Sequence, residues 1–440
     1  MSHSVTAAAL GLRLRHGFLA IPLTFAGLPI YMHAPDFYAL EFNISLAVIG
    51  FVLLALRIFD AVQDPLIGVL SDRYFKQRRV ITYIGGLLLA GGFWLLFNPH
   101  TFLWGQNYAL MWLSMSVVIC TTGFSMLSIN LQATGGLWAV ETQTRTLIAA
   151  TREAMGLLGL LMAAVIPALL FNYFPRREAF YWLSIVYVPL LALGVWVFLR
   201  WLHQAPLLAP QRDNNVNIRD LFKSGWINRF LLIYTLSTFS AAIPGILVIF
   251  FVRDYLQLES YTGLFLILYF VSGVLVMPLW QKLAEMIGKN SAWAASMLLA
   301  CAAFIGAFFL DPQALMAFSL VCIFSGMALG ADLALPQAIM ADQVALQPAA
   351  ASRYCALMAF LSKAALALAT GMVLPLVGLL GFQPGSLAHN DVLPYAYALI
   401  PCFIKAATAC YLFYCARRYY FHQAAPLQQN NPDKAILRHI

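Results

Sequence analysis

Long apolar segments, separated by short polar intervals, recur along the whole chain. A helix needs about 20 apolar residues to cross the roughly 30 Å hydrocarbon core of a bilayer, and the apolar segments of this chain reach that length. The pattern therefore predicts an all-α membrane protein with twelve transmembrane helices. The predicted spans are residues 17–39, 44–70, 80–99, 106–130, 146–172, 179–202, 226–252, 260–284, 291–310, 313–341, 352–380 and 391–416.

The longest polar interval joins the sixth span to the seventh and divides the spans into six and six. A shift of the sequence by 213 residues places Pro65 on Pro278 and Asp72 on Glu285, which indicates a duplicated six-helix unit. Two related six-helix halves are the plan of the major facilitator fold, whose binding site lies between the halves near the membrane midplane. We predict an N-terminal six-helix bundle at 1–202, a cytoplasmic linker at 203–224, a C-terminal six-helix bundle at 225–422 and a polar tail at 423–440.

Composition and charge support a membrane protein and exclude several other classes. Charged residues make up 10% of the chain, against about 25% in soluble proteins. Of the 26 Lys and Arg, the predicted topology places four within spans, three on one side and the remaining 19 on the other side. This asymmetry follows the positive-inside rule, so it predicts cytoplasmic termini in a plasma (bacterial inner) membrane and no nucleic-acid partner. We expect a monomer embedded in the lipid bilayer.

Two acidic residues interrupt the second predicted span. A run of thirteen residues, 44–56, carries no charge, and Arg57, Asp60 and Asp64 follow it directly. An ionised side chain inside a bilayer costs roughly 2.5–3.5 kcal/mol, and the i, i+4 spacing places both carboxylates on one helix face. Pro65 lacks an N–H and frees a backbone carbonyl one turn back. Because carboxylates and carbonyls are hard oxygen ligands, the sequence predicts a site for a monovalent metal cation or a proton.

Other charged residues within the predicted spans add candidates to this site. Arg152 lies on the fifth span, and Lys363 lies about two turns inside the eleventh. Ionisable residues in a membrane mark ion or substrate pathways by default, although an internal salt bridge that packs the bundle is the alternative. Asp332 on the tenth span is a further intramembrane charge with either a functional or a structural role, and Lys405 on the twelfth span is interpreted as a snorkelling or packing side chain.

The basic loop between the second and third spans, residues 71–79, has two interpretations. Its cations hold the loop in the cytoplasm. In addition, Asp72 and Arg73 are expected to pair with helix ends across the bundle and to latch one conformation. Glu141 and Arg145, between the fourth and fifth spans, are the expected partners of this gate.

Signatures of catalysis are missing from the sequence. The chain has no HExxH, no GxSxG, no phosphate-binding glycine loop and no paired CxxC. The seven cysteines lie in or beside apolar segments without metal-ligand spacing, so they are interpreted as small buried side chains. We therefore predict that the protein is not an enzyme and has no cofactor apart from a coupling cation.

The segment Arg57-Ile58-Phe59-Asp60-Ala61-Val62-Gln63-Asp64-Pro65-Leu66-Ile67-Gly68 resembles the glycoside–pentoside–hexuronide:cation symporters of the major facilitator superfamily. Met340-Ala341-Asp342, Arg353, Lys363 and Arg152 also match features of that family. The resemblance implies that Asp60 and Asp64 hold Na⁺, Li⁺ or H⁺. It also implies that Arg152 and Lys363 connect the cation site to the substrate site.

Three positions depart from the pattern of this family's sugar transporters. Thr24 stands where they have a sugar-binding aspartate, and Thr134 stands where they have a stacking tryptophan. Asn130 replaces a second aspartate and leaves the cation site an oxygen ligand without charge. Because these losses leave Arg152 and Lys363 less neutralised, they favour a substrate with a carboxylate or phosphate, such as a uronide.

The sequence as a whole predicts a secondary active transporter that works by alternating access. The expected reaction is Na⁺- or H⁺-coupled symport of a sugar, a glycoside or a hexuronide. Cation-coupled transport of a lysophospholipid or another amphiphile is an alternative, because lysophospholipid symporters of the same superfamily branch share the paired acids of span two. A membrane-embedded sensor or enzyme is the alternative from another class.

Overall fold

The computed structural model describes residues 10–42, 44, 46–99, 108–208, 222, 224–382 and 392–418. The first predicted span is divided into α1 (Leu10–Gly17), α2 (Ala20–Leu28), η1 (Pro29–His33) and α3 (Ala34–Phe42). Pro29 opens the π-helical segment η1, consistent with the missing N–H of proline, which cannot continue the regular hydrogen-bond ladder. The longer helices of the N-terminal half are α4 (Leu46–Arg73), α5 (Arg78–Phe97), α6 (Ala109–Leu137), α7 (Thr142–Tyr173) and α8 (Arg176–Gln204), with η2 (Phe75–Gln77) between α4 and α5.

The second half repeats this succession of long helices. Its last span is divided, as the first span of the chain is, and its π-helical segment η8 begins directly after Pro394. The elements are α10 (Gly225–Phe250), η5 (Phe251–Tyr255), η6 (Glu259–Tyr261), α11 (Thr262–Ile287), α12 (Lys289–Phe308), α13 (Leu315–Leu346), η7 (Pro348–Ala350), α14 (Ala351–Leu379), α15 (Val392–Pro394), η8 (Tyr395–Leu399) and α16 (Ile400–Arg418).

Among the described residues, ten helices are long and apolar enough to cross a membrane. The two other predicted spans are the divided first one and α4, which carries Arg57, Asp60 and Asp64 within its length. Large apolar side chains such as Phe51 and Leu275 are exposed on the outer surface of the bundle, where lipid rather than water would surround them. The protein is therefore an integral membrane protein, and the predicted all-α membrane fold is confirmed.

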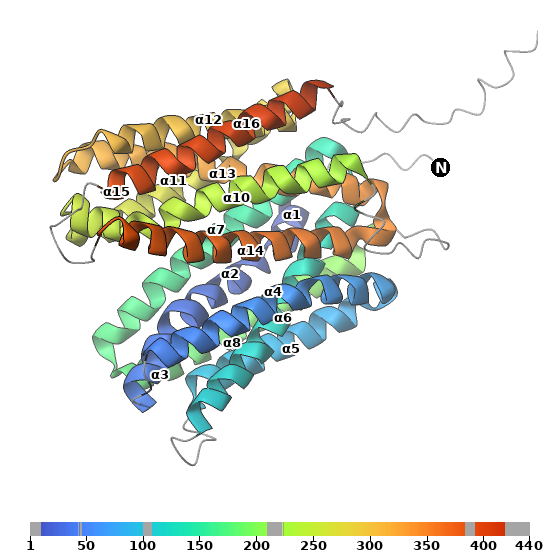
Figure 1. Ribbon diagram of the computed structural model, residues 1–440. Coiled ribbons are helices and arrows are strands. Elements are labelled where there is room, and N and C mark those ends of the chain that lie inside the picture. Colours follow the sequence, from blue (N-terminus) through green and yellow to red (C-terminus); the bar gives the residue numbers. More distant parts are fainter. Residues whose placement is uncertain are drawn as a thin grey trace, which may run out of the picture.

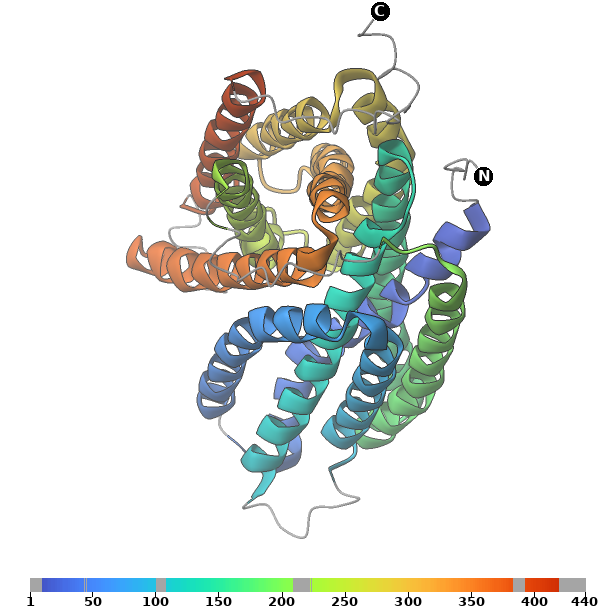
Figure 2. The same ribbon diagram turned by 90° about the vertical axis from the view of Figure 1, so that its right-hand side faces the viewer.

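The helices form two groups, α1 to α8 and α10 to α16 (Figures 1 and 2). Contacts of α4 with α14, and of α7 with α13 and α11, join the two groups. The groups lie close together at the end that holds the turn between α4 and α5, and they diverge toward the opposite end (Figure 1). We call the former the terminal end, because α1, the first described helix, begins on that side (Figure 1).

The start of the predicted linker packs on the N-terminal half. Leu207 forms an isolated β-bridge with Trp138, and the Leu208 N–H donates to the Leu137 carbonyl over 2.8 Å. Residues 209–221, residue 223 and the predicted polar tail at 423–440 lie outside the described residues. The domain boundaries therefore stay predictions.

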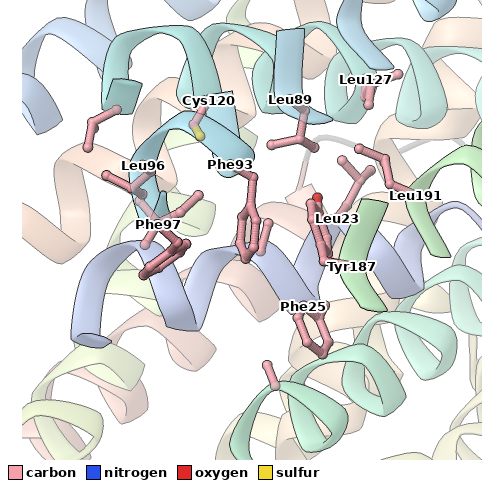
Figure 3. Close-up of a cluster of buried hydrophobic side chains, with 14 of the residues drawn as sticks. Leu23, Phe25, Leu89, Phe93, Leu96, Phe97, Cys120, Leu127, Tyr187 and Leu191 are labelled. Atoms are coloured by element: carbon pink, nitrogen blue, oxygen red, sulfur yellow. The ribbon is translucent and has the colours of Figure 1, made fainter. Parts of the chain in front are cut away.

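Aromatic and aliphatic side chains from several helices fill the N-terminal half (Figure 3). Phe93 of α5 packs on Tyr187 of α8 with ring centroids 4.1 Å apart, and Tyr187 stacks on Phe25 of α2 at 5.5 Å. Such contacts bind the helices through dispersion and ring geometry. They pack α2, α5 and α8 against one another within this half.

Close packing of α5 against α6 depends on Gly123. A Cβ at this position would lie 2.5 Å from the Leu89 nitrogen and 2.7 Å from the Gly85 carbonyl oxygen, so only glycine permits this approach. We expect Gly123→Leu to cost roughly 1–3 kcal/mol through overpacking and to lower the melting temperature of the purified protein by several degrees. Gly91→Leu is the matched control, because a Cβ at Gly91 of α5 meets no atom within 4 Å. Equal melting temperatures for the two variants would contradict this account.

Candidate functional site

Asp60 and Asp64 lie on the face of α4 that meets the C-terminal half. Their side chains are 4% and 0% exposed, and the Lys363 ammonium of α14 lies 2.8 Å from the Oδ2 atom of each. Lys363 also donates to Asp64 Oδ1 over 3.0 Å. The structure therefore brings together three of the residues that the sequence singled out, and it joins the two halves through them.

Three neutral side chains complete this cluster. Gln63 donates from Nε2 to Asp60 Oδ1 over 3.0 Å, and Ser125 of α6 donates to the same oxygen over 3.3 Å. Thr122 donates to Gln63 Oε1 over 2.9 Å, and Lys363 donates to Ser125 over 3.1 Å. The sequence analysis missed all three, although Gln63 lies inside the motif that drew attention to α4.

The charge of this cluster is unbalanced. Two carboxylates of Asp60 and Asp64 share the single ammonium of Lys363, which leaves a formal charge of −1 on these three side chains. Buried charges are stable when they are neutralised and hydrogen-bonded. One monovalent cation, or one proton on either aspartate, would complete the neutralisation.

The structure places Arg152 and Thr24 apart from the acid cluster. Arg152, 8% exposed at its side chain, donates to Glu153 over 2.5 Å. Thr24 donates to the Gly156 carbonyl over 2.6 Å, which is a contact between α2 and α7. These are the contacts of helix packing and of a local ion pair, so the predicted substrate roles of both residues stay predictions.

Asn130 and Thr134 of α6 are fully buried. Asn130 Oδ1 accepts hydrogen bonds from Arg78 over 2.6 Å and from Ser71 over 3.2 Å. It lies five residues after Ser125, about 7.5 Å along the helix, so it joins a different group from the aspartates. Thr134 donates to the carbonyl of Asn130 over 2.8 Å. The observed contacts of Asn130 thus differ from the predicted place beside Asp60 and Asp64, because a guanidinium takes its oxygen.

Asp72 connects the end of α4 to the start of α14. Its two oxygens accept the backbone N–H groups of Ser352 and Arg353 over 2.8 and 3.1 Å, as a carboxylate does at a helix N-terminus. Arg78 adds bonds to Ser352 Oγ over 2.9 Å and to Asp72 over 3.4 Å. We call Asp72, Arg78, Asn130, Ser352 and Arg353 the α4–α14 latch. Asp72 thus contacts a helix end of the opposite half, and its role as a gate stays a prediction.

Arg145, one of the expected partners of this gate, contacts a residue of the opposite half. Arg145 of α7 lies 3.5 Å from Asp342 of α13, and Lys289 of α12 donates to the other Asp342 oxygen over 2.6 Å. Lys289 also donates to the carbonyl of Thr142, at the start of α7, over 3.2 Å. We call Arg145, Asp342, Lys289 and Thr142 the α7–α13 latch. Arg73 and Glu141 are exposed, so the structure pairs residues of opposite halves where the sequence analysis paired residues of one half.

Glycines bring the halves together beside the two latches. A Cβ on Gly68 would lie 2.5 Å from the Ala356 Cβ and 2.9 Å from the Ser352 carbonyl, and a Cβ on Gly136 would lie 2.7 Å from Val344. Gly68 closes the motif that begins at Arg57. Its role is the close approach of α4 to α14, which sequence reasoning did not assign.

Known proteins provide an independent comparison. A family model described as MFS/sugar transport protein matches residues 16–416. A search among curated proteins finds no match. The chain resembles the structure of a bacterial homologue of the iron transporter ferroportin, with 14% identity, a TM-score of 0.70 and coverage of 92% of this chain and 99% of the other.

Two sugar transporters have similar structures. The fucose:proton symporter of E. coli matches with 16% identity and a TM-score of 0.66, over 92% of this chain and 97% of the other. A proton:xylose symporter matches with 12% identity and a TM-score of 0.62, over 93% of this chain and 94% of the other. At these identities the likeness shows the fold.

Proposed function

Because the chain belongs to the MFS/sugar transport protein family, we propose that it is a secondary active transporter that couples Na⁺ or H⁺ to the symport of a sugar, a glycoside or a hexuronide. The protein is a membrane transporter and not an enzyme, and it binds small-molecule substrates within the bilayer. The description of the matching family, which names sugar transport, supports a sugar-like substrate class.

The observation that carries the proposal is the position of Lys363 between two carboxylates. Asp60 and Asp64 belong to the N-terminal half and Lys363 to the C-terminal half, and both distances are 2.8 Å. A cation that binds the aspartates competes with the ammonium for the same oxygens. Cation binding would therefore weaken a bond between the halves, and this is the coupling that a symporter needs.

Lys363 can also connect cation binding to substrate binding. Its side chain is 24% exposed, far more than those of the buried aspartates, so an ammonium released from them has open space beside it. A ligand oxygen can then take the place of a carboxylate oxygen as its acceptor. Cation and substrate would favour the same state of Lys363, and a linkage of about 1–3 kcal/mol is typical of such coupling.

The two latches fix the conformation in which this exchange would begin. Both latches close the terminal end, whereas the halves diverge toward the opposite end (Figure 1). With cytoplasmic termini, as the charge asymmetry predicts, this is an outward-facing state. We propose that cation and substrate bind from the diverging end and that the latches then break to open the terminal end.

Uptake into proteoliposomes tests the proposal. Purified protein is reconstituted, an inward Na⁺ or H⁺ gradient is imposed, and a panel of radiolabelled sugars, glycosides, hexuronides and lysophospholipids is offered. We expect at least one sugar-like compound to accumulate above equilibrium, and an ionophore that dissipates the gradient to abolish that accumulation. Gradient-driven accumulation of lysophospholipids alone would favour the lipid alternative. Ligand binding without any uptake would contradict transport.

A further inference from the structure

A second buried pair of charges lies wholly inside the C-terminal half, away from the acid cluster. Lys405 of α16 forms an ion pair with Asp332 of α13, and their side chains are 5% and 13% exposed. Trp293 of α12 donates from Nε1 to Asp332 Oδ1 over 2.9 Å. The proposed coupling does not use these residues. A purely structural role is a weak explanation, because apolar side chains often stabilise a core as well as a buried ion pair does.

The pair borders a small cavity between α10, α11, α12, α13 and α16. Its volume is about 30 Å³, and on the same measure one water needs roughly 10–15 Å³. The cavity thus has room for about two non-hydrogen atoms. Tyr269, Ala300, Leu329, Asp332 and Lys405 are among the residues that line it.

The hydrogen bonds show which chemistry this cavity accepts. Lys405 has three N–H donors, and Asp332, the Ser237 hydroxyl and the Ser237 carbonyl accept them. Asp332 has about four acceptor positions, of which Trp293 and Lys405 take two. The cavity therefore presents vacant acceptor positions on a carboxylate whose charge an ammonium already balances. Such a site favours a neutral hydrogen-bond donor over an ion.

The side chain of Leu329 separates the cavity from the boundary between the halves. Leu329 lines the cavity and also packs on the cluster that contains Ala150 and Leu157 of α7. A group that enters past Leu329 would reach Asp332 from the space between the halves. The cavity therefore accepts a neutral group of about two non-hydrogen atoms that donates a hydrogen bond. A hydroxyl group and the carbon that bears it meet these requirements.

We propose that the cavity at Asp332 and Lys405 is a subsite for one neutral hydroxyl group of the transported sugar. Asp332 accepts the hydroxyl hydrogen, and Tyr269 is another polar residue that lines the same cavity. This inference rests on the proposed sugar transport and makes it more specific. The inserted hydroxyl of the substrate binds Asp332 in the C-terminal half. Lys363, once a cation has released it from the aspartates, binds a different oxygen of the same substrate.

A cavity-filling substitution tests the subsite without removing a charge. Ala300 of α12 is 6% exposed and lines the cavity, whereas Ala302 on the same helix is exposed. We expect Ala300→Val to lower the affinity for the tightest-binding aldohexose by about 10- to 100-fold, the range for one hydrogen bond to a charged group. Ala302→Val should leave the affinity unchanged. Isothermal titration calorimetry on the purified protein, with glucose, galactose, mannose and their methyl glycosides, measures both.

Monodeoxy analogues of the same sugar separate a binding role from a packing role. The analogue that lacks the inserted hydroxyl should bind the unsubstituted protein 10- to 100-fold more weakly and lose nothing further in Ala300→Val. Tyr269→Phe serves as a second variant if Ala300→Val fails to fold. Sugar binding that is indifferent to both substitutions would show that the cavity holds ordered water only, and the proposed transport would stand. If no sugar binds the unsubstituted protein, both proposals fail.

Discussion

Asp64→Asn is expected to abolish cation-stimulated accumulation of substrate while the protein stays folded in the membrane. The substitution preserves the shape of the side chain and removes one of the two carboxylates that share Lys363. The formal charge of the three side chains rises from −1 to 0, so the ammonium alone balances the site. Two unit charges about 4 Å apart interact by about 4 kcal/mol at an effective dielectric constant of 20. Cation affinity should therefore fall by about two to three orders of magnitude, and Asp60→Asn should act alike.

Lys363→Met should change cation binding in the opposite direction. Loss of the ammonium leaves the two carboxylates with a formal charge of −2, so the site should bind a cation or a proton more tightly than the unsubstituted protein does. Coupled uptake should still be lost, because nothing then connects cation binding to the C-terminal half. Asp311→Asn is the control for a general charge effect. It removes an exposed carboxylate from the connection between α12 and α13.

Cation binding is measured by calorimetry on purified protein, and accumulation is measured in proteoliposomes. If Asp60→Asn and Asp64→Asn both accumulate substrate against a gradient at the unsubstituted rate, the assignment of the cation site is wrong. If Asp64→Asn and Lys363→Met shift the cation affinity in the same direction, the competition between lysine and cation is wrong.

The sequence sufficed for the fold because the bilayer leaves few alternatives. A span must be apolar for about 20 residues and must satisfy its own backbone, so each helix leaves a clear pattern. The division of the first span at Pro29 was not predicted. A single proline in an apolar segment is compatible with a continuous kinked helix, as Pro65 inside α4 shows.

The ionised residues of the candidate site could be predicted, because burying a charge in a membrane is costly. Its neutral polar residues could not, because such residues are common in membrane helices. Asp60, Asp64 and Lys363 stand out because ionised groups in a membrane require partners, and they are partners of one another. Ser125 left no signal, since a serine in a membrane helix can bond to its own backbone. Asn130 was assigned to the cation site because it stands where the similar family has a second aspartate. Its position on α6 instead brings its side chain to Arg78.

The latch partners escaped prediction for a different reason. Asp72 and Arg145 are both in the N-terminal half, and nearby loops of one half are the natural first guess. The observed partners, Ser352 and Asp342, come from the other half. Which residues of two halves meet depends on the conformation of the transporter, and a single sequence does not specify that conformation.

Asp72→Ala is expected to open the terminal end. It removes the acceptor of two backbone N–H groups at the start of α14, and a hydrogen bond to a charged group contributes about 1.5–3 kcal/mol. Each 1.4 kcal/mol is about a tenfold change in an equilibrium constant, so the population of the opened state should rise at least about tenfold. Asp342→Ala should act in the same direction through the α7–α13 latch, and the two substitutions together should exceed either alone.

A native cysteine reports this opening. Cys355 of α14 is 4% exposed and lines a cavity between the halves together with Arg145 and Arg152. In a variant that keeps Cys355 as its sole cysteine, the rate of maleimide labelling of purified protein should rise at least about tenfold on Asp72→Ala, in proportion to the opened population. Arg73→Ala changes the neighbouring exposed side chain and should leave the rate unchanged. Equal labelling rates for Asp72→Ala and Arg73→Ala would show that the α4–α14 contacts follow closure of the terminal end and do not hold it.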